Sequence, residues 1–503
     1  MNQELTTSFK KVVKGTGVVF IGTILGTLLG FVFRVIVVRY ISKAEYGLLS
    51  LSLAMINILS MVSCLGFING VPRFISYALG KKEYGKVWAT IKTSIYLVAA
   101  FSIGFALILF FFSSHIADFF HEPDLASVIK IITFLLPLIA LTELLISILR
   151  GLEDVKAKVY FQDIFSMGIK IFIISVVILL GFSFNGVICT YLISNFLTLF
   201  FLVYYTKNRL FGSIPRKLNS NFSILKELLC FSLPLLGSSI FNLLRQRLTI
   251  LFLGYFKTAD VVGLYNAALP LAQLISMPLT AITFIYLPIA SQLYAQHNIQ
   301  DMKTLYTTVT KWTFCITLPI FLCMFLAPKL IIRVLFGVKY IEASTALQIL
   351  LFGFFIHTLL GPNGMTLVSL GKTKIMLFCS AIGTFTGIIA AILLIPHYGL
   401  NGAATSSFTS LIIMNFSSSL FLFKTSTVHP FSNDYIKPIS ITFVLYFITF
   451  CFVKVLSISV WWQIFVIIFF LAISFPITLF LTKSFTKQDT WIIKIIERKL
   501  ISK

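Results

Sequence analysis

The sequence predicts an all-α polytopic membrane protein of about 14 transmembrane helices, arranged as two six-helix lobes and a final helix pair. Three observations support this fold class. Of the 503 residues, 58% are hydrophobic and only 11% are charged, whereas a soluble domain carries about 25% charged residues. Apolar runs long enough to cross ~30 Å of hydrocarbon recur along the chain. The chain also matches itself at a shift of about 216 residues, which relates the two lobes.

The apolar runs define the transmembrane segments. Each run should be a helix, because only a helix satisfies its backbone hydrogen bonds locally in lipid. The fourteen predicted spans are 18–38, 46–68, 89–112, 128–149, 161–180, 185–205, 228–253, 263–287, 312–328, 343–361, 375–395, 400–423, 438–456 and 460–482. An even number of spans places both termini on the same side of the membrane.

The basic residues indicate which side holds the termini. With a cytoplasmic N-terminus, the inner segments contain 27 Lys and Arg residues and the outer loops contain 6. Lys and Arg concentrate in short cytoplasmic loops, so we expect a multi-pass protein of the cell membrane with both termini in the cytoplasm. Topology and anionic membrane lipids then explain the net charge of +23, and no nucleic acid partner is expected.

The internal repeat defines the predicted domains. The stretch YGLLSLSLAMINILS from Tyr46 aligns with VGLYNAALPLAQLIS from Val262, which pairs Gly47 with Gly263. Each lobe has an even number of spans, so the repeat is parallel, and in transporters the substrate site lies between such halves. The predicted domains are an N-terminal lobe at 1–210 (spans 1–6), a cytoplasmic linker at 211–227, a C-terminal lobe at 228–424 (spans 7–12), and 425–503 with spans 13 and 14 and a basic cytoplasmic tail.

Enzymatic motifs do not occur in the loops. The sequence has no GxxxxGK phosphate loop, no HExxH zinc motif and no DxD pair. No loop exceeds about 25 residues, which leaves no room for a soluble catalytic domain. The polar stretch HIADFFHEPD, from His115 to Asp124, fits a helix end in water better than a site for a divalent cation. We therefore expect a transporter rather than an enzyme, with no cofactor and no metal site.

Two opposite charges lie inside the predicted spans of the N-terminal lobe. Glu143 is in span 4 and Lys170 is at a comparable depth in span 5, and the two helices are adjacent and antiparallel. One interpretation is a structural ion pair that keeps both charges tolerable in the membrane. The other is an ion-coupling site, where H⁺ or Na⁺ competes with Lys170 for Glu143.

The first helix of each lobe carries arginines. Arg34 is in span 1, and Arg245 and Arg247 are in span 7. Arg34 is four residues, ~6 Å, from the outer end of its span and could snorkel to the interface. Snorkelling explains three arginines in related helices less well than a central anion site, because guanidinium groups match phosphate oxygens. Residues 245 and 247 are roughly 200° apart on a regular helix, and the repeat alignment does not decide which one matches Arg34.

Several stretches resemble a known family. GTILGTLLGFVFRVIVVRYISKAEYGLLSLSLAMINILS resembles the opening of the Wzx-type polysaccharide (oligosaccharide) flippases. LFLGYFKTADVVGLYNAALPLAQLIS, FIYLPIASQLYA and LLGPNGMTLVSLGKTK resemble their second half, so the resemblance runs from about residue 12 to residue 423. This family belongs to the MOP superfamily, with the lipid II flippases and the MATE drug exporters. Its architecture of two six-helix lobes and a final helix pair is the one that the repeat indicates.

The resemblance implies export of a lipid-linked oligosaccharide. The phosphate or diphosphate of a polyprenol carrier would enter a cationic central cavity, and rocking of the lobes, usually driven by an ion gradient, would expose it outside. Polysaccharide assembly enzymes are the protein partners it implies. Family members use basic residues in the first helix, in agreement with Arg34. Many relatives have an acid shortly before the LGYF motif, where this chain has Thr249, a departure that bears on the coupling scheme.

Three other functions compete with this one. A MATE-like exporter of drugs or organic cations would need acids in its cavity, whereas these spans hold one acid well inside the hydrocarbon region against several bases. A polytopic polysaccharide polymerase usually keeps a larger outer loop. A scaffold for assembly machinery would not need the charges in the spans.

Overall fold

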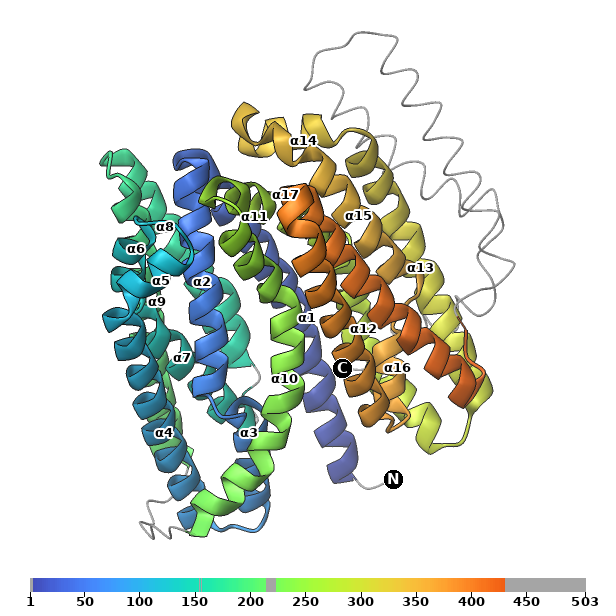
Figure 1. The fold of residues 1–503 in the computed structure, drawn as a ribbon. Helices are drawn as coiled ribbons and strands as arrows, with labels where there is room; N and C mark the ends of the chain where they lie inside the picture. Colours follow the sequence, from blue (N-terminus) through green and yellow to red (C-terminus); the bar gives the residue numbers. More distant parts are fainter. Residues whose placement is uncertain (1–2, 153, 155, 214–222, 430–503) are drawn as a thin grey trace. The chain divides into compact units, whose positions relative to one another are not determined.

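The computed structural model describes residues 3–429 except 153, 155 and 214–222 (Figure 1). Predicted spans 13 and 14 lie outside these residues. Every regular element within the described residues is a helix and none is a strand, which confirms the all-α fold class. The described chain forms two compact units, Val18–Asn266 and the chain from Ala267 onward with the first 17 residues, and each unit is considered by itself.

The helices follow one another closely along the chain. Those that build the first unit are α1 (Gln3–Tyr40), α2 (Lys43–Ser63), α3 (Phe67–Gly80), α4 (Tyr84–Phe111), α5 (Ser113–Phe119), α6 (Leu125–Ile132), α7 (Leu135–Gly151), η1 (Lys158–Phe165), α8 (Ser166–Leu179), α9 (Phe184–Ser213), α10 (Ser223–Phe256) and the start of α11 (Ala259–Leu274). Those of the second unit are α12 (Met277–Ala295), α13 (Ile299–Leu326), α14 (Pro328–Phe336), η2 (Val338–Ala343), α15 (Ser344–Leu359), α16 (Asn363–Ser369) and α17 (Thr373–Ser426).

Several predicted spans are broken helices. Among the described residues, eight helices are long and apolar enough to cross a membrane, or ten if each of two bent pairs is one span. Span 2, predicted at 46–68, covers most of α2 and ends at the turn before α3, where Gly66 takes a φ of 77°. Spans 11 and 12 run together as α17 across Gly399, whose backbone is not helical (φ 50°, ψ −120°). The total of 14 helices, the repeat and the domain boundaries stay predictions.

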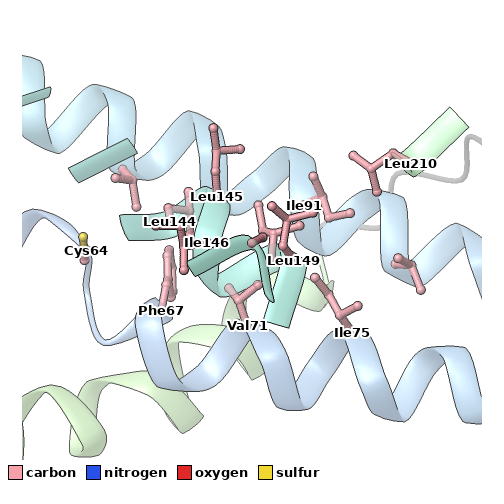
Figure 2. Packing of buried hydrophobic residues seen from close by; sticks show 14 of the residues in the cluster. Cys64, Phe67, Val71, Ile75, Ile91, Leu144, Leu145, Ile146, Leu149 and Leu210 are labelled. Atoms are coloured by element: carbon pink, nitrogen blue, oxygen red, sulfur yellow. The ribbon is translucent and has the colours of Figure 1, made fainter. Parts of the chain in front are cut away.

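The core of the first unit lies where α3, α4 and α7 meet (Figure 2). Phe67, Val71 and Ile75 of α3 are fully buried beside Leu149 of α7 and Ile91 of α4. In a membrane the surrounding lipid tails are as apolar as these side chains, so close van der Waals packing rather than release of water stabilises the contact.

Three glycines of α1 form a ridge that packs against η1 and α8. A Cβ added at Gly22, Gly26 or Gly30 would meet residues 159, 163 and 167, respectively. The spacing of four residues is the small-xxx-small pattern of close helix packing in membranes. The α1 helix therefore runs parallel to the continuous segment of η1 and α8, and each of its residues lies level with the residue 137 positions later. Arg34, four residues after Gly30, lies level with residue 171.

The second unit has a polar interior around α15, α16 and α17. The α15 helix packs against α13 and α17, and α16 packs against α17. His357 Nδ1 and Asn415 Oδ1 are 2.8 Å apart. Asn363 donates one hydrogen bond to the Asn415 carbonyl oxygen at 2.9 Å and another to the Ser419 hydroxyl at 2.9 Å. These bonds join the start of the short helix α16 to the second half of α17.

Candidate functional site

Arg34 lies on α1 near residues of α2, α9 and α10. Its side chain is half-buried, and its charge acts on Tyr46 of α2, Tyr191 of α9 and Arg247 of α10. The Tyr191 ring is held edge-on by Phe33, with the ring centroids 5.4 Å apart. The charge of Arg34 therefore acts on two phenol groups and on a second guanidinium group of the first unit.

The two arginines of α10 differ in their surroundings. The α10 helix runs from Ser223 to Phe256, and residues two apart on a helix are roughly 200° apart around its axis, so Arg245 and Arg247 point in different directions. Of the two, Arg247 is the one that interacts electrostatically with Arg34. The Nε atoms of both are buried, and neither has a hydrogen-bond partner in the described part of the chain. We therefore place Arg247 with Arg34 in the candidate site.

Among the residues that the structure describes, no acid forms an ion pair with Arg34 or Arg247. Ion pairs of the first unit, such as those of Lys86 with Glu83 and Arg209 with Asp154, include neither arginine. Two like charges in a poorly solvated region repel each other, and their unused N–H donors are costly. An anion with several oxygen acceptors would relieve both penalties, and a phosphate or diphosphate has the geometry that guanidinium groups match best.

Lys170 joins this region rather than Glu143. Its Nζ atom lies 5.8 Å from the centroid of the Tyr191 ring, the same ring on which Arg34 acts. The register of α1 against α8 also puts Arg34 and Lys170 at the same level. No ion pair between Lys170 and Glu143 occurs in the portion of the chain that the structure describes. The structure thus does not bring the two predicted partners together.

Glu143 belongs to a separate polar layer closer to the start of α8. Gln162 Nε2 donates a hydrogen bond of 2.7 Å to Glu143 Oε1, and the neighbouring Asp163 accepts one of 3.2 Å from the Thr23 hydroxyl. Both acceptors are carboxylates, and their charges act on each other. The cations that act on Glu143 are Lys158 and Arg150. This layer lies two turns below Lys170, because residues 163 and 170 are seven apart.

Asp163 is a second half-buried acid of this layer, and it was not predicted from the sequence. It lies in η1, a π-helix over Lys158–Phe165, and such segments are frequent at functional sites. A sequence signal was present, because Asp163 precedes Lys170 by seven residues and therefore shares its helix face. Asp163 lies at the inner end of predicted span 5, so the sequence did not distinguish it from an acid at the membrane surface.

The polar stretch from His115 to Asp124 has a structural role. Glu122 Oε1 accepts a hydrogen bond of 2.6 Å from the backbone N–H of Ala259, the first residue of α11. The Phe119 ring lies 4.8 Å from the Tyr255 ring, measured between centroids. Of the described residues, no three His, Cys, Asp or Glu side chains are grouped as a metal site would require. The stretch docks against the α10–α11 connection.

Comparisons with known proteins agree with this architecture. Residues 12–294 match the model of the polysaccharide biosynthesis protein family, and residues 234–393 match the MatE model. An uncharacterized membrane protein of Methanocaldococcus jannaschii is 23% identical over 80% of this chain and 82% of its own length. The lipopolysaccharide biosynthesis protein WzxC of Escherichia coli (strain K12) is 24% identical over 76% of this chain and 75% of its own.

Solved structures share the fold. The lipid II flippase MurJ in an inward closed conformation has a TM-score of 0.71 at 15% identity, over 92% of this chain and 98% of its own. A multidrug resistance MATE family transporter of the MOP superfamily, inward-facing, has a TM-score of 0.66 at 17% identity, over 80% of this chain and 96% of its own. At these identities the likeness concerns the fold alone. The family match covers more than half of the sequence, so the chain belongs to the polysaccharide biosynthesis protein family, the family of the Wzx-type flippases within the MOP superfamily.

Proposed function

We propose that the protein moves a polyprenyl phosphate- or diphosphate-linked oligosaccharide from the cytoplasmic to the outer leaflet of the cell membrane. The observation that carries this proposal is the pair Arg34 and Arg247, two cations without an acid partner among the described residues. The carrier phosphate would bind there and satisfy the buried N–H donors. The family match and the similarity to the lipopolysaccharide biosynthesis protein WzxC of Escherichia coli support the substrate class.

Transport would proceed by alternating access, with both termini in the cytoplasm as the distribution of Lys and Arg predicts. The sugar would cross with the phosphate while the lipid tail stays in the bilayer. Polysaccharide assembly enzymes would supply the substrate inside and consume it outside.

An ion gradient is the proposed driving force. Glu143 and Asp163 are two half-buried carboxyl groups in the layer below the cations, and H⁺ or Na⁺ binding there would change the charge beneath the site. Ionisable groups within the membrane commonly mark such pathways. In this proposal Lys170 contributes to the cationic layer, and Glu143 acts in coupling without it.

A MATE-like cation antiporter is the second candidate, because residues 234–393 match the MatE model. Such a protein would bind an organic cation, which the Arg34–Arg247 pair would repel. The chemistry of this pair therefore favours the anionic substrate.

Reconstitution tests the proposal. Purified protein in liposomes would receive a short-chain polyprenyl diphosphate sugar, and an external sugar-binding probe would report its appearance on the far leaflet. Wild type should speed exposure, and Arg34→Gln and Arg247→Gln should each reduce it. The control is Arg39→Gln, an exposed arginine of the same helix, which should behave as wild type. Equal exposure in all variants, with transport of an organic cation instead, would support the antiporter.

A further inference from the structure

The first turns of α2 and α11 touch backbone to backbone. Gly47 faces the carbonyl oxygen of Ala259, and Gly263 faces the carbonyl oxygen of Lys43. A Cβ on either glycine would collide with the oxygen that it faces. No side chain separates the two helices here, so the contact exists only while both positions lack a Cβ.

This contact is reciprocal under the sequence repeat. Adding 216 to residues 43 and 47 gives 259 and 263. Gly47 meets Ala259, and its repeat counterpart Gly263 meets Lys43, which is the repeat counterpart of Ala259. An arrangement in which i contacts j and j contacts i is that of a twofold interface. The α2–α11 contact therefore lies on the local axis that relates the two predicted lobes, a position where helices of both lobes can separate symmetrically.

The two helices differ in how their N-termini are satisfied. In α2 a local capping box does this: the Glu45 backbone N–H donates to the Ser42 hydroxyl at 3.2 Å, and the Ser42 backbone N–H donates to the Glu45 carboxylate at 2.8 Å. The repeat counterpart of Glu45 is Val261, which has no carboxylate. Asp260 lies in the first turn of α11, and Glu122 of the α5–α6 connection accepts the Ala259 N–H.

The carboxylate of Glu122 is well placed for this role. A helix N-terminus carries partial positive charge and free N–H groups, which a carboxylate stabilises. The contact of Phe119 with Tyr255 lies beside it. Both interactions join the region around the end of α5, in the first predicted lobe, to the region where α10 ends and α11 begins, in the second. Phe119 and Tyr255 are exposed, so water could reach these groups if they parted.

We propose that the Gly47–Gly263 contact and the Glu122 cap form the outer closure of the transporter. The closure holds α2 and α11 together while the Arg34–Arg247 site faces inward, and it parts when the site opens outward. This inference rests on the alternating access and the topology of the proposed function. Parting is inexpensive, because the contact has no interlocking side chains and water can replace Glu122 at the Ala259 N–H.

Cysteine accessibility tests the closure without any substrate. In a background with the seven native cysteines replaced, Ser50→Cys, one turn below Tyr46 on α2, would report opening to a membrane-impermeant maleimide added outside. Gly47→Val and Gly263→Val should each raise the labelling rate by about tenfold, since overpacking disfavours the closed arrangement. The two variants should act alike, because the contact is reciprocal. Gly104→Val is the control, since a Cβ at Gly104 meets nothing within 4 Å, and it should label as the parent does.

Glu122→Ala provides a second variant that leaves the helix contact itself intact. It should raise labelling in the same direction by a smaller factor, and Glu122→Gln, whose amide oxygen can still accept the Ala259 N–H, should restore most of the parent rate. Unchanged labelling in Gly47→Val and Glu122→Ala, with normal amounts of protein in the membrane, would overturn the closure. If the variants change the labelling rate but wild type moves no lipid-linked sugar, the proposed function is wrong and the closure is supported. If wild type moves the sugar but the variants label as the parent does, only the closure is wrong.

Discussion

Gln162 donates a hydrogen bond of 2.7 Å to Glu143, so an uncharged amide is the direct partner of this intramembrane acid. An amide can hold either a carboxylate or a carboxylic acid, because it offers both a donor and an acceptor. The pairing therefore permits the carboxyl group to gain and lose a cation without losing its position.

The first prediction concerns this acid. Glu143→Gln should abolish the stimulation of flipping by an imposed H⁺ or Na⁺ gradient and leave exchange without a gradient near the wild-type rate. Liposomes with and without each gradient provide the measurement. Asp154→Asn is the control, because Asp154 accepts a hydrogen bond of 2.6 Å from Tyr205 outside the coupling layer. Gradient stimulation that survives in Glu143→Gln would contradict the coupling role.

The second prediction separates Glu143 from Lys170. Because Lys170 lies over Tyr191 and forms no recorded ion pair with Glu143, the two residues should contribute independently to stability. The double variant Glu143→Gln/Lys170→Met should change the free energy of unfolding by the sum of the single changes, within about 0.5 kcal/mol. Thermal unfolding in detergent of the two single variants and the double variant measures this. A larger coupling energy would support a direct ion pair between Glu143 and Lys170.

The third prediction follows from repulsion within the site. Removing one of two unpaired like charges should stabilise the protein without substrate, so Arg247→Gln should raise the free energy of unfolding by about 1 kcal/mol. The same variant should lose the stabilisation that added diphosphate gives the wild type. Arg39→Gln should change neither quantity. A destabilised Arg247→Gln protein would mean that Arg247 has a structural partner.

The fourth prediction concerns the glycine ridge of α1. A Cβ at Gly26 would approach Asp163 Cβ to 2.7 Å, so Gly26→Ala should lower the free energy of unfolding by about 1–3 kcal/mol. Gly168→Ala in α8 is the matched control, since a Cβ there meets nothing within 4 Å. Unfolding midpoints of the two variants decide the matter; equal midpoints would show that α1 can shift to accept the methyl group.

Apolar length was enough to predict where the helices lie. Each of the twelve spans predicted between residues 18 and 423 falls on a helix or a broken helix, because hydrocarbon forces the backbone into helices whatever the packing. The family was predicted from sequence as well, and the comparisons confirm it. Spans 438–456 and 460–482 lie beyond the described chain.

Side-chain partners were less accessible to sequence reasoning. Equal depth on adjacent helices suggested Glu143 with Lys170, but depth does not fix which way each side chain points around its helix. The ridge of Gly22, Gly26 and Gly30 against η1 fixes that rotation, and it turns Lys170 toward Tyr191. Glu122 could not have been assigned to Ala259, because these residues are 137 apart and no pattern links them.

The cap that α11 receives from Glu122 makes the second half of the chain dependent on the first. In the predicted repeat each half has an equivalent helix, but α2 closes its N-terminus with its own Glu45, whereas the first N–H of α11 binds Glu122 although Asp260 lies in the same turn. A fragment beginning at the linker would keep Asp260 in the first turn of α11 but would lack the carboxylate that accepts the Ala259 N–H. Separately expressed halves should therefore associate through this end, and a chain built from two copies of the second half would lack Glu122 in both copies.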